Sequence, residues 1–155
     1  MDVLDWIKKA NKFDSNKFLD GFGVEIIQDE NVIDIQRQQW GDDGKDSKGS
    51  VIGFYKKKTE ELSGGRKIAG TPWTLNNTGD FWSRTFLTAA INGKDLLFQF
   101  NSTGINKDKL FETIQFHGEI TDPDTIFGLY DFYQKRFIKL IEPKFVEQLN
   151  NYYDV

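Results

Sequence analysis

Two neighbouring apolar segments constrain the fold of this chain more than any other feature. Residues 86–91 read FLTAAI, residues 96–100 read LLFQF, and Asn92-Gly93 follows directly on the first segment. Both residues of an Asn-Gly pair accept the positive φ of a type I′ turn, which makes this pair the strongest short signal for a β-hairpin. The sequence therefore predicts a hairpin at about residues 83–101, and with it a small antiparallel sheet.

Helical patterns precede the hairpin. Apolar residues recur at spacings of three and four over residues 2–19, which predicts helix there. Asp14 or Ser15 is the expected cap of a second short helix, and Gly21 and Gly23 predict a break after it. Residues 24–40 could form a helix or, around residues 32–35, a short strand. Because they contain neither Pro nor Gly, the helix is favoured.

Helical patterns also follow the hairpin. Residues 107–116 carry an apolar face behind Asn106, which is the expected cap. Residues 130–152 form a long amphipathic pattern that Pro143 interrupts, so a kink or a break is expected there. Together these patterns predict an α+β fold, in which N-terminal helices, a small antiparallel sheet and a long C-terminal helix form a single domain over residues 1–155.

A long polar loop is expected at about residues 41–78. Its first part reads GDDGKDSKGS, and residues 53–62 could hold a short strand or a helical turn. Asp42, Asp43 and Asp46 lack the spacing of a calcium loop, so they are interpreted as solvated turn residues. The loop contains the basic residues Lys56, Lys57, Lys58, Arg66 and Lys67. This cluster is either a solvated surface or a patch that contacts an acidic partner.

Composition argues against several classes of function. The net charge of −4 and the pI of about 5.0 are unlike those of a general nucleic-acid binder. The chain has no Cys and a single His, His117, so thiolate and His-rich metal sites are excluded. No nucleophile–base pair or phosphate loop is recognisable, and no apolar run reaches the length of a membrane span. We therefore expect a protein without enzymatic activity, cofactor, metal or membrane contact that folds in a cytoplasm.

The corner before the hairpin, NNTGDFWSRTF at residues 76–86, is expected to be structural. Gly79 suits a backbone position with positive φ. Asn77, Thr78 or Asp80 can bond free amides at the start of the turn that carries Phe81. The aromatic residues that are expected to cover the root of the hairpin are Trp73, Phe81, Trp82 and Phe86.

Several short motifs follow one another in a characteristic order. Trp40 ends a helix before a Gly/Asp turn, and Trp73 lies in a later segment. The first motif comprises Leu75, Thr78, Gly79 and Phe81, the second comprises Gln115, Phe116 and Gly118, and the third comprises Ile126, Phe127, Gly128 and Leu129. In this order, over residues 30 to 150, the chain resembles the tail-completion, or virion morphogenesis, proteins of tailed bacteriophages.

This resemblance implies a structural protein of the virion neck or tail, assembled in the bacterial cytoplasm. Such a protein would form a ring of copies, six by the resemblance, that completes or caps the tail tube or joins it to the head connector. The ring would enclose the DNA channel without reading sequence, and an acidic wall would repel phosphates. Function would then lie in the polar loop and the outer surfaces. Two alternatives remain open: a small ligand-binding module or enzyme of unknown chemistry, and an adaptor that binds an acidic partner through Lys56 to Lys58.

Overall fold

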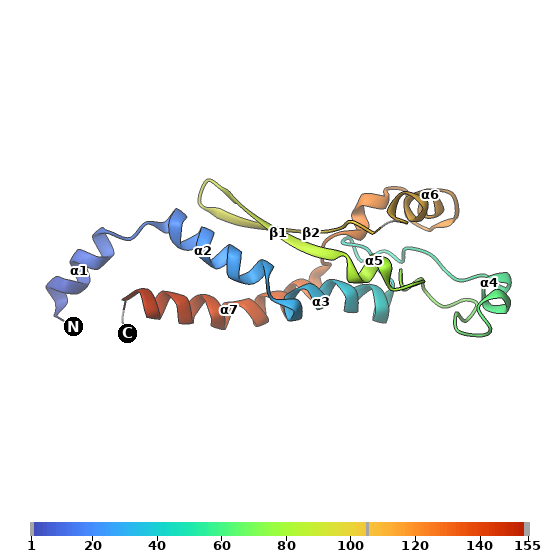
Figure 1. The fold of residues 1–155 in the computed structure, drawn as a ribbon, viewed down its shortest axis with the longest axis horizontal. Coiled ribbons are helices and arrows are strands. Elements are labelled where there is room, and N and C mark those ends of the chain that lie inside the picture. Colours follow the sequence, from blue (N-terminus) through green and yellow to red (C-terminus); the bar gives the residue numbers. More distant parts are fainter. Residues whose placement is uncertain (1, 105, 154–155) are drawn as a thin grey trace.

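A computed structural model describes residues 2–104 and 106–153, which form an elongated α+β fold (Figure 1). Helix α1 and the end of α7 lie at one end of the molecule, and helix α4 lies at the other. The elements in chain order are α1 (Val3–Asn11), α2 (Ser15–Ile27), α3 (Glu30–Gln38), the π turn η1 (Gln39–Asp43), α4 (Lys57–Leu62), α5 (Asp80–Ser83), β1 (Thr85–Asn92), β2 (Asp95–Ser102), α6 (Lys107–His117), the 3₁₀ turn η2 (Pro123–Ile126) and α7 (Asp131–Tyr153).

Helix α2 begins at the predicted cap but does not end at the predicted break. The carboxylate of Asp14 accepts a hydrogen bond of 3.0 Å from the backbone N–H of Lys17. The helix continues through Gly21 and Gly23 to Ile27, so the predicted break is wrong. A Cβ at Gly23 would lie 3.1 Å from the Cβ of Ala89. The glycine therefore lets α2 approach β1 closely, and this packing offsets the ~1 kcal/mol that glycine costs inside a helix.

The ambiguous segment at residues 24–40 is helical, which confirms the favoured interpretation. The chain leaves α2 at Gln28 and starts α3 behind Asp29, whose carboxylate accepts a hydrogen bond of 2.9 Å from the N–H of Asn31. The buried residues of α3 are Val32, Ile33, Ile35 and Gln36.

The predicted hairpin is present, but its turn is displaced by one residue. β1 pairs with β2 in antiparallel register from Thr85↔Ser102 to Asn92↔Asp95. The two-residue loop is therefore Gly93-Lys94 and not Asn92-Gly93. Only Gly93 of these residues has a positive φ, of 64°, so the turn is not type I′. Cross-strand packing sets this register, because it buries Leu87 and Phe100 on the face toward the helices.

The two C-terminal helices are confirmed. Asn106 stands at the N-cap position of α6, as predicted, but its side chain makes no capping hydrogen bond. Helix α7 runs through Pro143 without a break. Its buried side is centred on Tyr133, whereas the neighbouring Phe132 is 54% exposed.

Two hydrophobic clusters make up the core. The first lies where α2 packs against β1 and α7, and it contains Phe22, Ile26, Val32, Ile33, Ile35, Leu87, Phe100, Leu129 and Tyr133. The second lies at the α6 end of the molecule and contains Trp40, Ile52, Leu75, Phe81, Ile114, Ile120 and Ile126. The continuous helical segment formed by α3 and η1 contributes residues to both clusters.

The region at residues 41–78 is more structured than a polar loop. It starts with η1 and later forms α4, and isolated bridges pair Lys45 with Val51 and Phe54 with Pro72. Ile52 is fully buried. Asp46, predicted to be solvated, is only 2% exposed. Its carboxylate accepts hydrogen bonds from Ser50 N and Thr125 Oγ1, both at 2.8 Å, which is why it can lie inside.

Candidate functional site

Three aromatic rings from distant parts of the sequence meet at the corner before the hairpin. Trp40 lies 5.2 Å from Phe81 and 6.2 Å from Phe127 between ring centroids, and Phe81 lies 6.0 Å from Phe127. Trp40 and Phe81 are buried, and Phe127 is half-buried. The corner is therefore a packed joint between η1, α5 and the loop before α7.

The three glycines of the sequence motifs each have a steric reason. Gly79 has a φ of 81° and Gly128 a φ of 107°, which side chains rarely adopt. At Gly118, a Cβ would lie 2.5 Å from the carbonyl oxygen of Ile114 and 2.8 Å from that of Ile52. The φ of 81° at Gly79 confirms the positive φ predicted for this residue.

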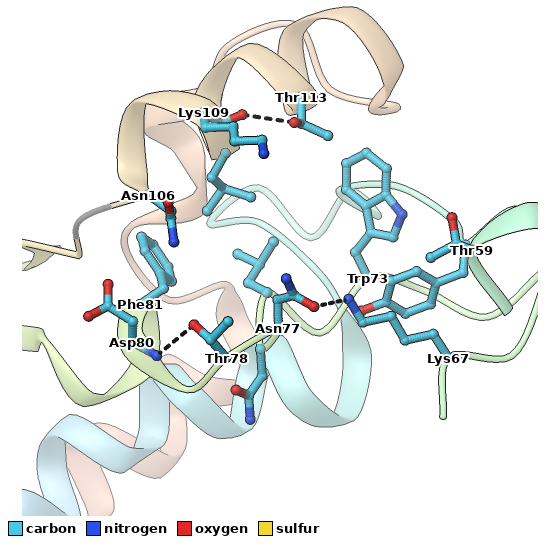
Figure 2. Close-up of a pocket in the computed structure, with 14 residues that line it drawn as sticks. Thr59, Lys67, Trp73, Asn77, Thr78, Asp80, Phe81, Asn106, Lys109 and Thr113 are labelled. Atoms are coloured by element: carbon cyan, nitrogen blue, oxygen red, sulfur yellow. Dashed lines mark hydrogen bonds between the residues drawn. The ribbon is translucent and has the colours of Figure 1, made fainter. Parts of the chain in front are cut away.

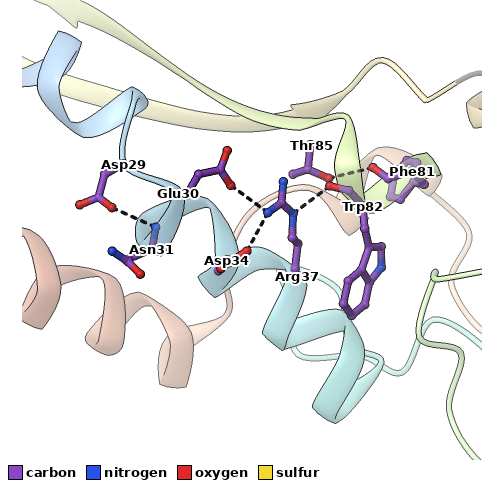
Figure 3. Close-up of polar contacts among 8 residues, drawn as sticks. All are labelled: Asp29, Glu30, Asn31, Asp34, Arg37, Phe81, Trp82 and Thr85. Atoms are coloured by element: carbon purple, nitrogen blue, oxygen red, sulfur yellow. Dashed lines mark hydrogen bonds and ion pairs between the residues drawn. The ribbon is translucent and has the colours of Figure 1, made fainter. Parts of the chain in front are cut away.

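Arg37 fastens the corner to α3 (Figure 3). Its Nε donates to the carbonyl oxygen of Trp82 at 2.8 Å, and its Nη1 donates to Asp34 at 2.7 Å and to Glu30 at 3.0 Å. On the other side of α5, the hydroxyls of Thr85 and Ser102 both donate to the carbonyl oxygen of Phe81. The short helix α5 is thus tied both to α3 and to the two strands.

Two buried glutamines hold the segment between η2 and α7, a role that the sequence analysis does not predict. Gln36 accepts from Gly128 N at 2.7 Å and donates to the carbonyl of Ile126. Gln39 donates to the carbonyl of Gly128 at 3.0 Å and accepts from Tyr130 N at 3.1 Å. The only available signal is the run IQRQQW at residues 35–40, where amides fall on the apolar face of a helix.

The remaining predicted structural residues have mixed outcomes. Trp73 is half-buried beside the second cluster. Thr78 is exposed, and its hydroxyl accepts from Asp80 N at 3.4 Å. The prediction that Phe116 is structural is wrong, because its side chain is 75% exposed on α6. Ile114, two residues earlier, fills the core from that helix instead.

A pocket of about 340 Å³ opens beside the corner (Figure 2). Its walls come from α6, from the segment before α5, and from the start of α4. Trp73, Leu75, Phe81 and Leu110 give it apolar walls, and the polar lining includes Lys67, Asn77, Asp80, Asn106 and Lys109. Lys67 and Lys109 reach the pocket from opposite sides. Apolar walls with a few convergent polar groups are typical of a binding site.

Leu75 has an unusual backbone conformation on the wall of this pocket. Among the residues that the structure describes, it is the one non-glycine residue with a positive φ, at 54°. A left-handed backbone costs an ordinary residue about 1–2 kcal/mol. Such strain persists where surrounding structure enforces it, and it is found frequently at binding sites.

The predicted basic residues lie next to the pocket, around α4. Lys56, Lys57, Lys58 and Arg66 are exposed, whereas Lys67 is half-buried. The Nζ of Lys67 donates to Asn77 at 2.6 Å and lies 5.4 Å from the ring centroid of Tyr55. Residues 56–67 carry these five cations and two carboxylates, a net charge of +3 in a chain of −4. The rest of the chain therefore carries −7.

Helix α1 lies at the end of the molecule opposite α4 (Figure 1), and it exposes apolar side chains there. Every residue of this helix is exposed or half-buried. Val3 is 71% exposed, Leu4 62%, Trp6 49% and Ile7 45%. The stacking of Trp6 on Tyr153, with ring centroids 5.8 Å apart, holds the helix against the end of α7.

Within the described residues, no group of three metal-ligating side chains comes together, and no helix is long and apolar enough to cross a membrane. His117 is exposed on α6. No protein-family model, curated protein or solved structure matches the chain.

Proposed function

We propose that the protein is a structural assembly protein of a tailed bacteriophage that works as a ring of copies. In this proposal it completes or caps the tail, or joins it to the head connector, in the neck of the virion. The resemblance of its motifs supplies the virion context and the ring of six. Its partners are further copies of itself and the tail-tube and head-connector proteins, and no step of the function is catalytic.

The observation that carries the proposal is the large accessible surface of the single chain. The chain exposes 9979 Å², whereas a compact monomer of 18.0 kDa would expose about 8,000 Å². The excess includes large apolar side chains at both ends of the molecule, such as Leu4 on α1 and Leu62 on α4. Exposed apolar surface of this kind is typical of proteins that bury it in an assembly.

The placement of the motif residues also supports a framework role. Leu75, Phe81 and Ile126 belong to one hydrophobic cluster, and Phe127 packs against it. The motif glycines permit the close approaches and turns that build this corner. The polar and basic surfaces around α4 are not part of this cluster and are exposed to solvent, where neighbours in a ring can contact them.

The test is the state of the purified protein, alone and with phage tails that lack it. We expect light scattering and native mass spectrometry to give a closed oligomer, and electron microscopy to place it as a ring at the tail end. A protein that stays monomeric at all concentrations and does not bind tails would refute the proposal.

A second candidate function, binding of a small ligand, is favoured by the pocket beside Trp73. Its apolar walls with Lys67 and Lys109 suit an aromatic carboxylate. Thermal melting with indole-3-acetate would test this, with indole as the uncharged control. A higher Tm with the acid, lost in Lys109→Glu, would favour the ligand-binding module over the assembly protein, and an unchanged Tm would count against it.

A further inference from the structure

The chain carries exposed apolar groups in the first turn of α1 and an apolar pocket at the opposite end, and the acidic residues of this turn complement the basic segment beside the pocket. At one end, α1 exposes Val3 and Leu4 between the carboxylates of Asp2 and Asp5. At the other end, an apolar pocket lies beside a segment of net charge +3. We propose that α1 of one copy binds in this pocket of a second copy.

The pocket suits an apolar side chain that is followed by a carboxylate. Its volume of about 340 Å³ is at the small end for ligand sites, which favours one or two side chains over a large ligand. Trp73, Leu75 and Leu110 supply apolar contact. Its one carboxylate, that of Asp80, is held by Arg84 at 2.8 Å, whereas Lys109 is exposed on α6 and lines the pocket.

Helix α1 offers the matching side chains on a preformed helix. The carboxylate of Asp2 caps the helix by accepting from Leu4 N at 3.4 Å. Asp5 lies one position after Leu4, and its contact with Lys8 is an exposed pair at 3.9 Å, which contributes little. The acidic first turn of α1, which carries Leu4, would therefore meet a pocket beside a basic segment, while Lys8 and Lys9 lie in the last turn of the helix.

The geometry requires two copies. In Figure 1, α1 lies at the end of the long axis opposite α4, so one molecule cannot fill its own pocket. A contact between two different surfaces of identical chains is heterologous, and it produces a ring when the rotation closes. A stable interface of standard size buries about 800 Å² on each partner, and each copy would use two such faces. The surface of 9979 Å² exceeds that of a compact monomer by about 1,900 Å², which is enough for both faces.

The inference rests on the proposed assembly of copies and is tested with two full-length variants. The helix variant, Val3→Lys with Leu4→Lys, alters α1 and leaves the pocket intact. The pocket variant, Asn106→Trp with Lys109→Glu, fills the pocket with a larger side chain, replaces its positive charge at residue 109 with a negative one, and leaves α1 intact. All four residues are exposed, and the side chain of Asn106 makes no capping hydrogen bond, so both variants should keep the circular dichroism and the melting temperature of the parent.

Each variant alone should associate at least about tenfold more weakly than the parent, measured by light scattering over a dilution series. An equimolar mixture of the two should form one-to-one dimers and nothing larger, because only the junction between an intact helix and an intact pocket remains. As a matched control, Ile138→Lys with Lys94→Glu changes similar exposed residues elsewhere and should assemble like the parent.

The outcomes separate the two proposals. If the parent forms a ring and the helix or pocket variant forms it equally well, this contact is refuted and the assembly function stands. A mixture that stays monomeric also refutes the contact. If the parent itself is monomeric at every concentration, both the contact and the proposed assembly are refuted.

Discussion

Trp40 and Ile126, which are 86 positions apart in the sequence, are joined by a hydrogen bond of 2.9 Å from the indole Nε1 to the backbone carbonyl. Both residues are fully buried. The bond connects the end of the N-terminal helices to the turn before α7, and the aromatic corner is packed around it.

Replacing Trp40 with Phe should lower the free energy of unfolding by about 1–3 kcal/mol, because the buried carbonyl of Ile126 loses its better donor. The remaining donor, Gln36 Nε2, lies 3.4 Å away. Urea denaturation measures the loss. Trp6→Phe, at a half-exposed position, should cost less than about 0.5 kcal/mol. Equal losses for the two variants would contradict the role given to this bond.

Two glycine substitutions should have opposite effects. Gly118→Ala should destabilise the protein, because the new Cβ would lie 2.5 Å and 2.8 Å from two backbone carbonyl oxygens that cannot move cheaply. Gly21→Ala should stabilise it by about 0.5–1 kcal/mol, because Gly21 lies inside α2 and no atom lies within 4 Å of the position that the added methyl group would occupy. Thermal melting compares the two, and a lower Tm for Gly21→Ala would show that α2 does not run through this residue.

Stability should fall in alkaline solution as Tyr130 ionises. Burial is the main cause that raises the pKa of the Tyr130 hydroxyl to about 12, and its hydrogen bond to Asp43 and the charge of that carboxylate add to it. The unfolded chain loses this proton near pH 10. The contribution of the protonated Tyr130 to the free energy of unfolding is therefore complete below about pH 10, and it is lost as the pH rises from about 10 to about 12. Urea denaturation across this range should give a falling free energy of unfolding.

Tyr130→Phe is the control for this pH effect and should make the decline shallower. Some decline should remain, because burial followed by the charges of Asp43 and Asp42 also raises the pKa of Tyr133. An identical slope in parent and variant would contradict the assignment to Tyr130.

Hydrogen exchange should divide the region at residues 41–78 into two parts. The amide of Ile52 bonds the carbonyl of Gly44 at 2.9 Å and is buried, so it should exchange slowly in the monomer. The amides of residues 57–70 lie in a mostly exposed segment and should exchange quickly until assembly covers them. Strong protection of residues 57–70 in the isolated monomer would contradict this expectation.

Lys57→Glu should separate folding from assembly. Lys57 is exposed at the start of α4, so the variant should melt like the parent. It should nevertheless join tails or copies more weakly, because a carboxylate would face the acidic surface of a neighbour. Infectivity or in-vitro joining of heads and tails is the measurement, and unchanged assembly would argue that α4 contacts no acidic partner.

Local patterns are enough to predict much of the fold. The hairpin follows from the two apolar segments on either side of Asn92-Gly93, and the start of α6 follows from Asn106. The errors arise where tertiary contacts override local preference. Gly23 stays helical because it packs on Ala89, and the turn moves to Gly93-Lys94 because cross-strand pairing sets the register.

Less of the candidate site can be predicted from the sequence. The structural residues Trp40, Gly79 and Phe81 can be identified because each belongs to a recognisable local motif. The pocket cannot be identified from the sequence, because its walls come from segments around Tyr55, Trp73 and Leu110 that meet only after folding. The positive φ of Leu75 is equally hidden, since a leucine carries no local signal for it.

The elongated shape has a hydrodynamic consequence. A long, rough-surfaced particle experiences more friction than a sphere of equal mass, so the monomer should diffuse and sediment more slowly than compact proteins of 18.0 kDa. On a gel-filtration column it should elute early, at the position of a larger globular standard. If copies join end to end into a ring, the frictional ratio should change with each added copy and fall when the ring closes, which sedimentation velocity can follow directly.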